Sequence, residues 1–123
     1  TGPYLLYTIV RMKSILNKYV EQGGSLEGLE LMDAKNGSEK GLMMQLAGFN
    51  AMMATAAEEI APHKVCAFIY DTANAFNHFY HETKILSEEN ETRKAGFIAL
   101  LAITKRVLEA CIDVLGFEAP ERM

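Results

Sequence analysis

The chain has 123 residues, a formal net charge of −4 and a hydrophobic content of 50%. This length fits one domain with a closed apolar core and is short for two domains. No apolar run is long enough, or free enough of charge, to span a bilayer, and no signal peptide is present, so we predict neither a membrane nor a secreted protein. Cys66 and Cys111 lie within apolar helical patterns, as expected for reduced packing residues of a cytoplasmic protein. Because the chain opens on Thr1-Gly2-Pro3 without an initiator methionine, we expect it to be a piece of a longer protein.

The first predicted helix covers residues 4–20, with Pro3 suited to its first turn and Gly23-Gly24 suited to end it. Apolar side chains recur every three or four positions, at Leu5, Ile9, Met12, Leu16 and Tyr19. Residues 1–20 carry three basic side chains, Arg11, Lys13 and Lys18, and no acid. The sequence therefore predicts basic surface on this helix, and on part of the last one, although the whole chain is acidic.

Residues 23–37 are predicted to form a flexible connection within the domain, with a short helical turn, because glycines and acids interrupt its apolar positions. Ser38 is the expected cap of a second helix that runs to residue 60. Its expected buried face is Leu42, Leu46, Phe49, Met53, Ala56 and Ile60. Met43, Met44 and Met52 add soft bulk, which is typical either of core filling or of a binding groove.

Pro62 is expected to open a third helix over residues 63–82, whose stretch 73–81 holds three aromatic residues, two histidines and two asparagines. At helical spacing, Phe76, Phe79 and Tyr80 share one face. A neighbouring polar face carries Asp71, Asn74, His78 and His81. The pattern predicts a helix with one side in the core and the other able to touch a ligand.

Asn90 is the expected cap of a fourth helix over residues 91–115, and Gly116 is placed to stop it in a left-handed conformation. Residues 117–123 would then form a short extended tail. No strand pattern is found in the sequence. We therefore predict an all-α fold, an antiparallel helical bundle of four main helices with an extended C-terminal tail.

The sequence offers no set of residues for catalysis. His78 and His81 lie one turn apart, near Asp71 and Glu82, and bundles can bind metal through such pairs when a second helix supplies further ligands. His63 is the only other histidine. No phosphate-binding glycine loop and no Cys-x-x-Cys pair is present. We predict no catalytic and no metal site in this chain, which leaves open whether the whole protein is an enzyme.

Three motifs in the sequence resemble those of one known domain family. The segment Thr1-Gly2-Pro3-Tyr4-Leu5-Leu6-Tyr7, followed by Arg11, is similar to the opening segment of that domain. Tyr70 with Phe76-Asn77-His78-Phe79-Tyr80 resembles its central helix, and Ile85-Leu86 the link after it. Leu115-Gly116-Phe117-Glu118-Ala119-Pro120-Glu121-Arg122-Met123 resembles its end. By these motifs residues 1–123 resemble a single DALR anticodon-binding domain, the C-terminal domain of arginyl-tRNA synthetase.

The resemblance implies an all-α domain that holds the anticodon loop of arginine tRNA, with no DNA or membrane partner. It also implies that a catalytic domain elsewhere in the protein attaches arginine to the tRNA and uses ATP and Mg²⁺, so that this chain itself needs no cofactor. In the family, the central anticodon base enters a pocket walled by aromatic residues and the C-terminal methionine. Carried over by motif, the candidate RNA-binding residues are Tyr4, Tyr7, Arg11 as a phosphate contact, Asn77, Tyr80, His81 and Met123.

The chain departs from the family pattern at two places. Thr8-Ile9-Val10 stands where many members carry alanine and a histidine or tyrosine, so no contact is carried over there. Phe49-Asn50 stands where Phe-Pro is common, which predicts a straighter second helix. Two other functions remain as alternatives: a helical-bundle protein–protein interaction module that uses the methionines as its groove, and a metalloprotein that uses the two histidines.

Overall fold

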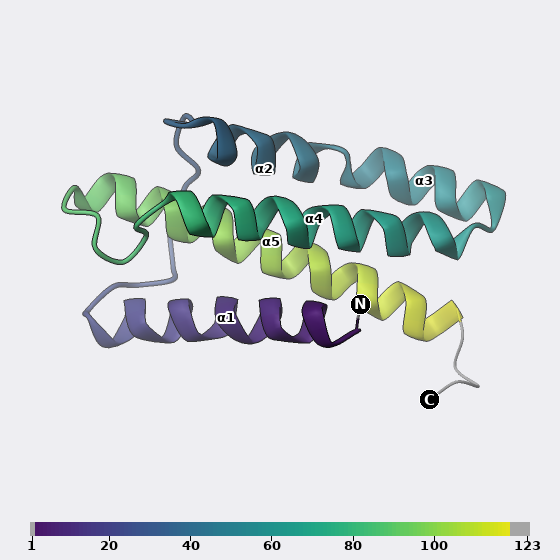
Figure 1. Cartoon of the computed structure of the whole chain (residues 1–123), viewed down its shortest axis with the longest axis horizontal. Helices are drawn as coiled ribbons and strands as arrows, with labels where there is room; N and C mark the ends of the chain where they lie inside the picture. Colours follow the sequence, from purple (N-terminus) through teal and green to yellow (C-terminus); the bar gives the residue numbers. More distant parts are fainter. Residues whose placement is uncertain (1, 119–123) are drawn as a thin grey trace.

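The computed structural model describes residues 2–118 of the chain, and side chains over residues 2–116. Within this range all regular structure is helical, which confirms the predicted all-α bundle. The helices are α1 (Gly2–Glu21), α2 (Gly37–Ala47), α3 (Phe49–Glu59), α4 (Pro62–Glu82) and α5 (Glu91–Glu118). Helices α2 and α3 follow one another along one side of α4, α1 lies on the other side, and α5 runs behind (Figure 1). Helix α4 is antiparallel to α2, α3 and α5 and runs in the same direction as α1 (Figure 1).

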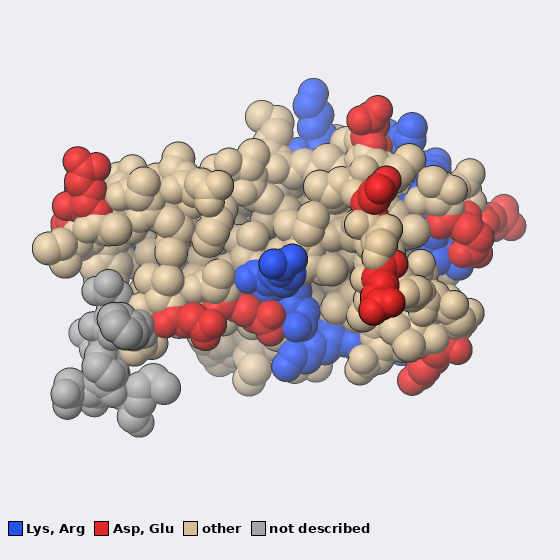
Figure 2. All heavy atoms as spheres, turned by 180° about the vertical axis from the view of Figure 1, so that it is seen from behind, with Lys and Arg blue, Asp and Glu red and all other residues tan. Residues whose placement is uncertain are grey.

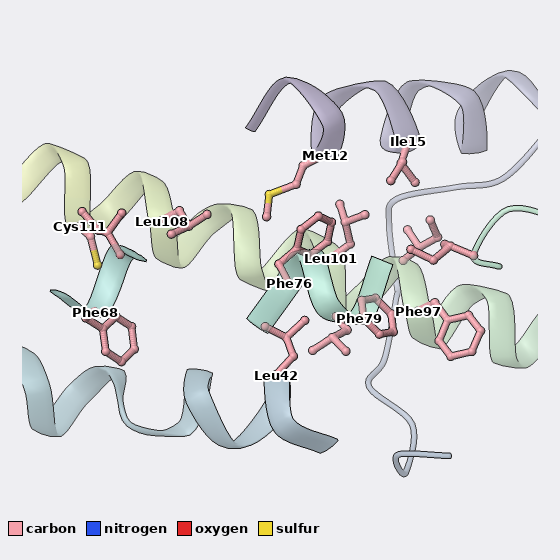
Figure 3. Close-up of a cluster of buried hydrophobic side chains, with 14 of the residues drawn as sticks. Met12, Ile15, Leu42, Phe68, Phe76, Phe79, Phe97, Leu101, Leu108 and Cys111 are labelled. Carbon is pink, nitrogen blue, oxygen red and sulfur yellow. The ribbon is translucent and has the colours of Figure 1, made fainter. Parts of the chain in front are cut away.

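Helix α4 is the centre of the core because it contacts every other helix. Figure 3 shows its aromatic side chains Phe76 and Phe79 between Met12 of α1, Leu42 of α2 and Leu101 of α5, and all five are fully buried. Burying a large apolar side chain contributes about 1.5–3 kcal/mol, so this cluster supplies much of the stability of the fold. The predicted aromatic core face of the third helix is therefore confirmed.

The second predicted helix is interrupted at Gly48, so the expected straight helix over 38–60 is wrong. Gly48 has φ −83° and ψ −1°, and its N–H donates to the carbonyl oxygens of Gln45 and Leu46, which tightens the last turn of α2. Glycine favours such a break because it loses more backbone entropy in a helix than any other residue. The break places the Phe49 ring 6.1 Å from that of Phe68 on α4. A proline is therefore not needed to bend this element.

The start of α2 also differs from the prediction. Asn36, rather than Ser38, is the cap: its Oδ1 accepts hydrogen bonds from the Glu39 N–H at 2.8 Å and from the Ser38 hydroxyl at 2.7 Å. The buried Glu39 carboxylate accepts from the N–H of Lys35 at 2.6 Å. This reciprocal arrangement satisfies two free N–H groups at once, which is why the helix begins two residues earlier than a serine cap would place it.

The predicted starts of α4 and α5 are confirmed, but the predicted end of α5 is wrong. Pro62 opens α4, and the Asn90 side chain accepts from the Arg93 N–H at 3.0 Å. Gly116 lies inside α5, which continues to Glu118, so residues 117 and 118 are helical rather than extended. One helical glycine costs only about 1 kcal/mol, which packing along a long helix can offset. The rest of the expected tail, residues 119–123, lies outside the described residues.

The connection at residues 22–36 lies against α5, and the expected helical turn is not formed in it. A Cβ atom built on Gly96 of α5 would meet the Cγ atom of Met32 at 2.6 Å, so Gly96 provides the space that Met32 occupies. Leu29 packs against the core from the same connection. Its flexibility stays a prediction. Among the described helices none is long and apolar enough to cross a membrane.

Candidate functional site

Five of the seven residues predicted from the sequence meet along the seam between α1 and α4. Tyr4, Tyr7 and Arg11 follow one another at helical spacing on α1, and Asn77 and Tyr80 do so on α4. We call these five residues the tyrosine–arginine cluster. The two helices run in the same direction, so successive residues of α1 meet successive turns of α4 (Figure 1). Residues that are about 70 positions apart in the chain thus form one site.

Asn77 is the centre of the hydrogen bonds within the cluster. Its Nδ2 group donates to the hydroxyl oxygen of Tyr4 and to that of Thr8, at 2.9 Å each. Its Oδ1 atom accepts from an Nη group of Arg11 at 2.9 Å. The side chain is buried, with 8% exposed. The sequence places Asn77 among the RNA contacts, but the structure has its amide already engaged by α1.

The guanidinium of Arg11 lies close to two tyrosine rings. Its guanidinium carbon is 4.1 Å from the centre of the Tyr80 ring and 4.8 Å from that of the Tyr7 ring. Its second Nη group donates to the Tyr7 hydroxyl at 3.0 Å. A guanidinium over an aromatic face gains about 0.5–2 kcal/mol, more where water is excluded. The cluster therefore holds its one positive charge against aromatic surface rather than extended into solvent.

Three further residues complete the site and were not among the candidates. The Tyr4 hydroxyl donates to Asn74 Oδ1 at 2.7 Å, and the Tyr4 ring lies 6.0 Å from that of Tyr70. Thr8 is fully buried beneath the cluster, and its hydroxyl donates to the backbone oxygen of Tyr4 at 2.9 Å. The spacing of residues 70, 74 and 77 on one face of α4 is a signal that could have identified Tyr70 and Asn74 from the sequence.

An apolar pocket of about 410 Å³ lies beside the cluster, where the first turns of α1, the first half of α4 and the end of α5 meet. Its lining includes Tyr4, Leu5, Cys66, Ile69, Tyr70 and Leu115. Pockets of this size and polarity bind small flat groups when a few polar groups fix the orientation. The Tyr4 side chain belongs to both the pocket and the cluster, and its hydroxyl bonds to Asn74 and Asn77 fix its direction.

The remaining two candidates differ in how the structure places them. His81 is exposed next to the cluster, with its ring 5.3 Å from the Tyr80 ring in an edge-on arrangement. Met123 lies outside the described residues.

Cys66, predicted to pack in the core, is exposed on α4, because it lies on the side of this helix that faces the pocket. Cys111 is buried as predicted, and its burial raises the pKa of its thiol to about 11.

Charge on the molecule is mixed, and the predicted basic surface is found only in part. Figure 2 shows Lys and Arg atoms gathered in the middle of the face opposite to that of Figure 1, with acidic atoms beside them and a broad uncharged area next to them. On α5, Lys105 pairs with Glu109 at 3.0 Å and Lys94 with Glu91 at 3.4 Å. On α1, Lys13 and Lys18 are exposed and form no ion pair with the residues that the structure describes. Among the described residues, both of these lysines of α1 are thus unpaired, whereas both lysines of α5 are paired.

The structure gives the two alternative functions little support. Met44 is exposed, but Met43 and Met52 pack against the core, so only one of three methionines is available for a groove. His78 pairs with Glu82 at 3.1 Å on the same helix. Within residues 2–118 no three His, Cys, Asp or Glu side chains come close enough together to hold a metal ion.

The fold and the site together define a class of protein. An all-α domain that presents several tyrosine rings and an arginine at an exposed seam is suited to binding unstacked bases, which stack on aromatic and guanidinium planes. Residues 5–123 match the family described as the DALR anticodon binding domain, and the chain belongs to this family.

The chain is similar to several arginine–tRNA ligases. The chain is 62% identical over its full length to the arginine–tRNA ligase of Agathobacter rectalis, 43% identical to that of Alkaliphilus oremlandii and 41% identical to that of Maricaulis maris. It spans only 20–21% of the length of each of these relatives. The similarity therefore concerns one domain of a much longer protein.

Proposed function

We propose that this chain binds the anticodon loop of arginine tRNA and reads at least one of its bases. The support comes from the family to which the chain belongs and from relatives that are named arginine–tRNA ligases. The observation that carries the proposal is the tyrosine–arginine cluster, which gathers Tyr4, Tyr7, Arg11 and Tyr80 at one seam. Each base that stacks on an aromatic side chain contributes about 1–3 kcal/mol, so two or three such contacts hold an open loop.

The pocket beside Tyr4 suits one base that has left the stack of the loop. Aromatic rings of Tyr4 and Tyr70 wall it, and polar atoms of Asn74 and Asn77 hold the Tyr4 hydroxyl at its edge. Leu115, near the end of α5, also lines it. Five residues follow Glu118, and an extended chain of that length reaches at most about 17 Å, so Met123 has the length to approach the pocket wall. We assign Met123 to this wall, and His81 to the polar rim next to Tyr80.

We further propose that the chain acts as part of an arginine–tRNA ligase in the cytoplasm, in the service of translation. The catalytic domain, with its sites for arginine, ATP and Mg²⁺, would lie outside this chain, which spans only 20–21% of the length of the ligases it resembles. In that protein the anticodon domain holds one end of the tRNA while its acceptor end reaches the catalytic domain. The role of this chain is therefore recognition rather than chemistry.

Binding to RNA stem-loops tests the proposal. The chain is titrated, at low and at moderate salt, with the anticodon stem-loop of arginine tRNA and with the same stem-loop whose central anticodon base is changed. We expect tighter binding of the native loop and a loss of affinity with salt, because phosphate contacts release counterions. Equal binding of the two loops would show that base reading does not reside in this chain.

A further inference from the structure

The directions of the hydrogen bonds around Asn77 are fixed by chemistry. An arginine can only donate, so the Asn77 atom that faces Arg11 must be the oxygen. The Nδ2 group then faces the hydroxyl oxygens of Tyr4 and Thr8, and both of its hydrogens are used. The Asn77 side chain is buried and therefore has no N–H left to offer to a ligand. Asn77 therefore acts on the residues of α1 to which it is hydrogen-bonded.

Arg11 is held by this arrangement at both of its Nη groups. One donates to Asn77 on α4 and the other to Tyr7 on α1, so the guanidinium stays over the Tyr80 ring, 4.1 Å from its centre. A base cannot stack on that face of Tyr80 while Arg11 covers it. The Tyr80 ring also packs on Phe76, with ring centres 6.4 Å apart and planes 29° apart. The planar groups that this part of the seam leaves for a base are the guanidinium and the exposed Tyr7 ring beside it, whose hydroxyl accepts a hydrogen bond from Arg11.

We propose that Asn77 is a positioning residue that holds Arg11 on Tyr80, and that Arg11 acts there as a stacking surface for a base rather than as a phosphate contact. The inference rests on the proposed function and specifies the role of two residues within it. It replaces the role predicted for Arg11 from the sequence. Arginine suits this task because its guanidinium is flat and weakly hydrated, whereas a lysine ammonium offers a point charge without a plane.

The substitutions Arg11→Lys and Arg11→Ala separate the two roles. A stacking surface requires the plane, so both variants are expected to bind the native stem-loop about 10-fold more weakly, with little change in the slope of log Kd against log salt. A phosphate contact requires only the charge. Arg11→Lys would then bind almost as the unmodified chain does, and Arg11→Ala would lower the salt slope by about 0.7. That second pattern would overturn the proposal.

A double-mutant cycle then tests whether Asn77 acts through Arg11. Asn77→Leu keeps the size of the side chain but removes its hydrogen bonds, and we expect it to weaken binding about 10-fold on its own. Combined with Arg11→Lys, the loss should stay well below the product of the two single losses, because nothing is left to position. A fully multiplicative loss of about 100-fold would mean that Asn77 touches the RNA independently. Asn50→Leu, at an exposed asparagine of α3 outside the cluster, is the matched control and should not couple to Arg11.

The positioning role of Asn77 can also be tested by a measurement that needs no RNA. The guanidinium carbon of Arg11 lies 4.1 Å from the centre of the Tyr80 ring and 4.8 Å from that of Tyr7, so the δ-methylene protons, on the carbon two bonds away, should show upfield ring-current shifts in the NMR spectrum. These shifts should be lost in Asn77→Leu and kept in Asn50→Leu. Unchanged shifts in a folded Asn77→Leu variant would refute the positioning role, whereas absent RNA binding with the expected shifts would refute only the proposed function. If Asn77→Leu does not fold, Asn77→Ser takes its place in both tests.

Discussion

The close contact between Gly96 and Met32 yields a prediction about the connection of residues 22–36. Replacing a glycine inside a helix by alanine normally stabilises the fold by about 1 kcal/mol. At Gly96 the new Cβ atom would lie 2.6 Å from Cγ and 3.1 Å from Cβ of Met32, so the methionine must leave its place. Met32 is 37% exposed, and losing its partial burial costs about 1–1.5 kcal/mol. The two effects nearly cancel, and Gly96→Ala alone should be neutral or slightly destabilising.

The outcome changes once Met32 is shortened. In a Met32→Ala background the colliding Cγ atom is absent and only the Cβ atom, at 3.1 Å, still has to shift, so Gly96→Ala should now raise the free energy of unfolding by up to about 1 kcal/mol. The four chains are compared by urea denaturation followed by far-UV circular dichroism. Gly41→Ala in α2, where an added Cβ atom meets nothing within 4 Å, is the control and should stabilise both backgrounds equally. An equal gain from Gly96→Ala in both backgrounds would show that the connection does not lie against α5.

The remaining predictions concern the site, a helix cap and the cysteines. Tyr80→Ala and deletion of Met123 should each weaken binding of the native stem-loop without unfolding the bundle, as followed by titration and circular dichroism; unchanged affinity in both would remove the site assignment. Asn36→Ala should lower the free energy of unfolding by about 1 kcal/mol in urea, because it removes the cap of α2; no loss would exclude the cap. A thiol reagent at pH 8 should modify Cys66 quickly in the folded chain. It should reach Cys111 only on unfolding, since burial raises the pKa of that thiol to about 11 and keeps it protonated; equal rates would contradict this burial.

Local sequence signals predicted most of the helices, and they failed where packing decides. Pro62 and Asn90 act within their own turn, so their roles could be read from neighbouring residues. Gly48 and Gly116 have the same intrinsic preference, yet one interrupts a helix and the other continues it. The difference comes from the surroundings: Gly48 lies against α4 near Phe68, whereas nothing lies within 4 Å of an added Cβ atom at Gly116. Intrinsic propensity is a weak guide when tertiary contacts differ.

In the candidate site too, sequence motifs predicted the residues, but packing decides how they are arranged. Family motifs nominated Tyr4, Tyr7 and Arg11 on the first helix, and Asn77 and Tyr80 on another helix. That the two faces meet follows from the packing of α1 on α4, which no local pattern contains. Asn77 was nominated as a ligand contact because it lies in the family motif that contains Tyr80, but its three partners on α1 satisfy it in the interior. Polarity alone could not show which way this side chain faces.

The register of α4 has a consequence for how this domain can change in length. Its core residues Phe76 and Phe79 alternate with its cluster residues Asn77 and Tyr80, one position apart. A helix turns by about 100° per residue, so inserting or deleting one residue earlier in α4 would rotate this whole stretch and exchange the two faces. Changes in chain length are therefore compatible with both folding and binding only outside α4, in connections such as residues 22–36 and 83–90. The number of residues in α4 therefore sets the direction of its core side chains and of its binding side chains together.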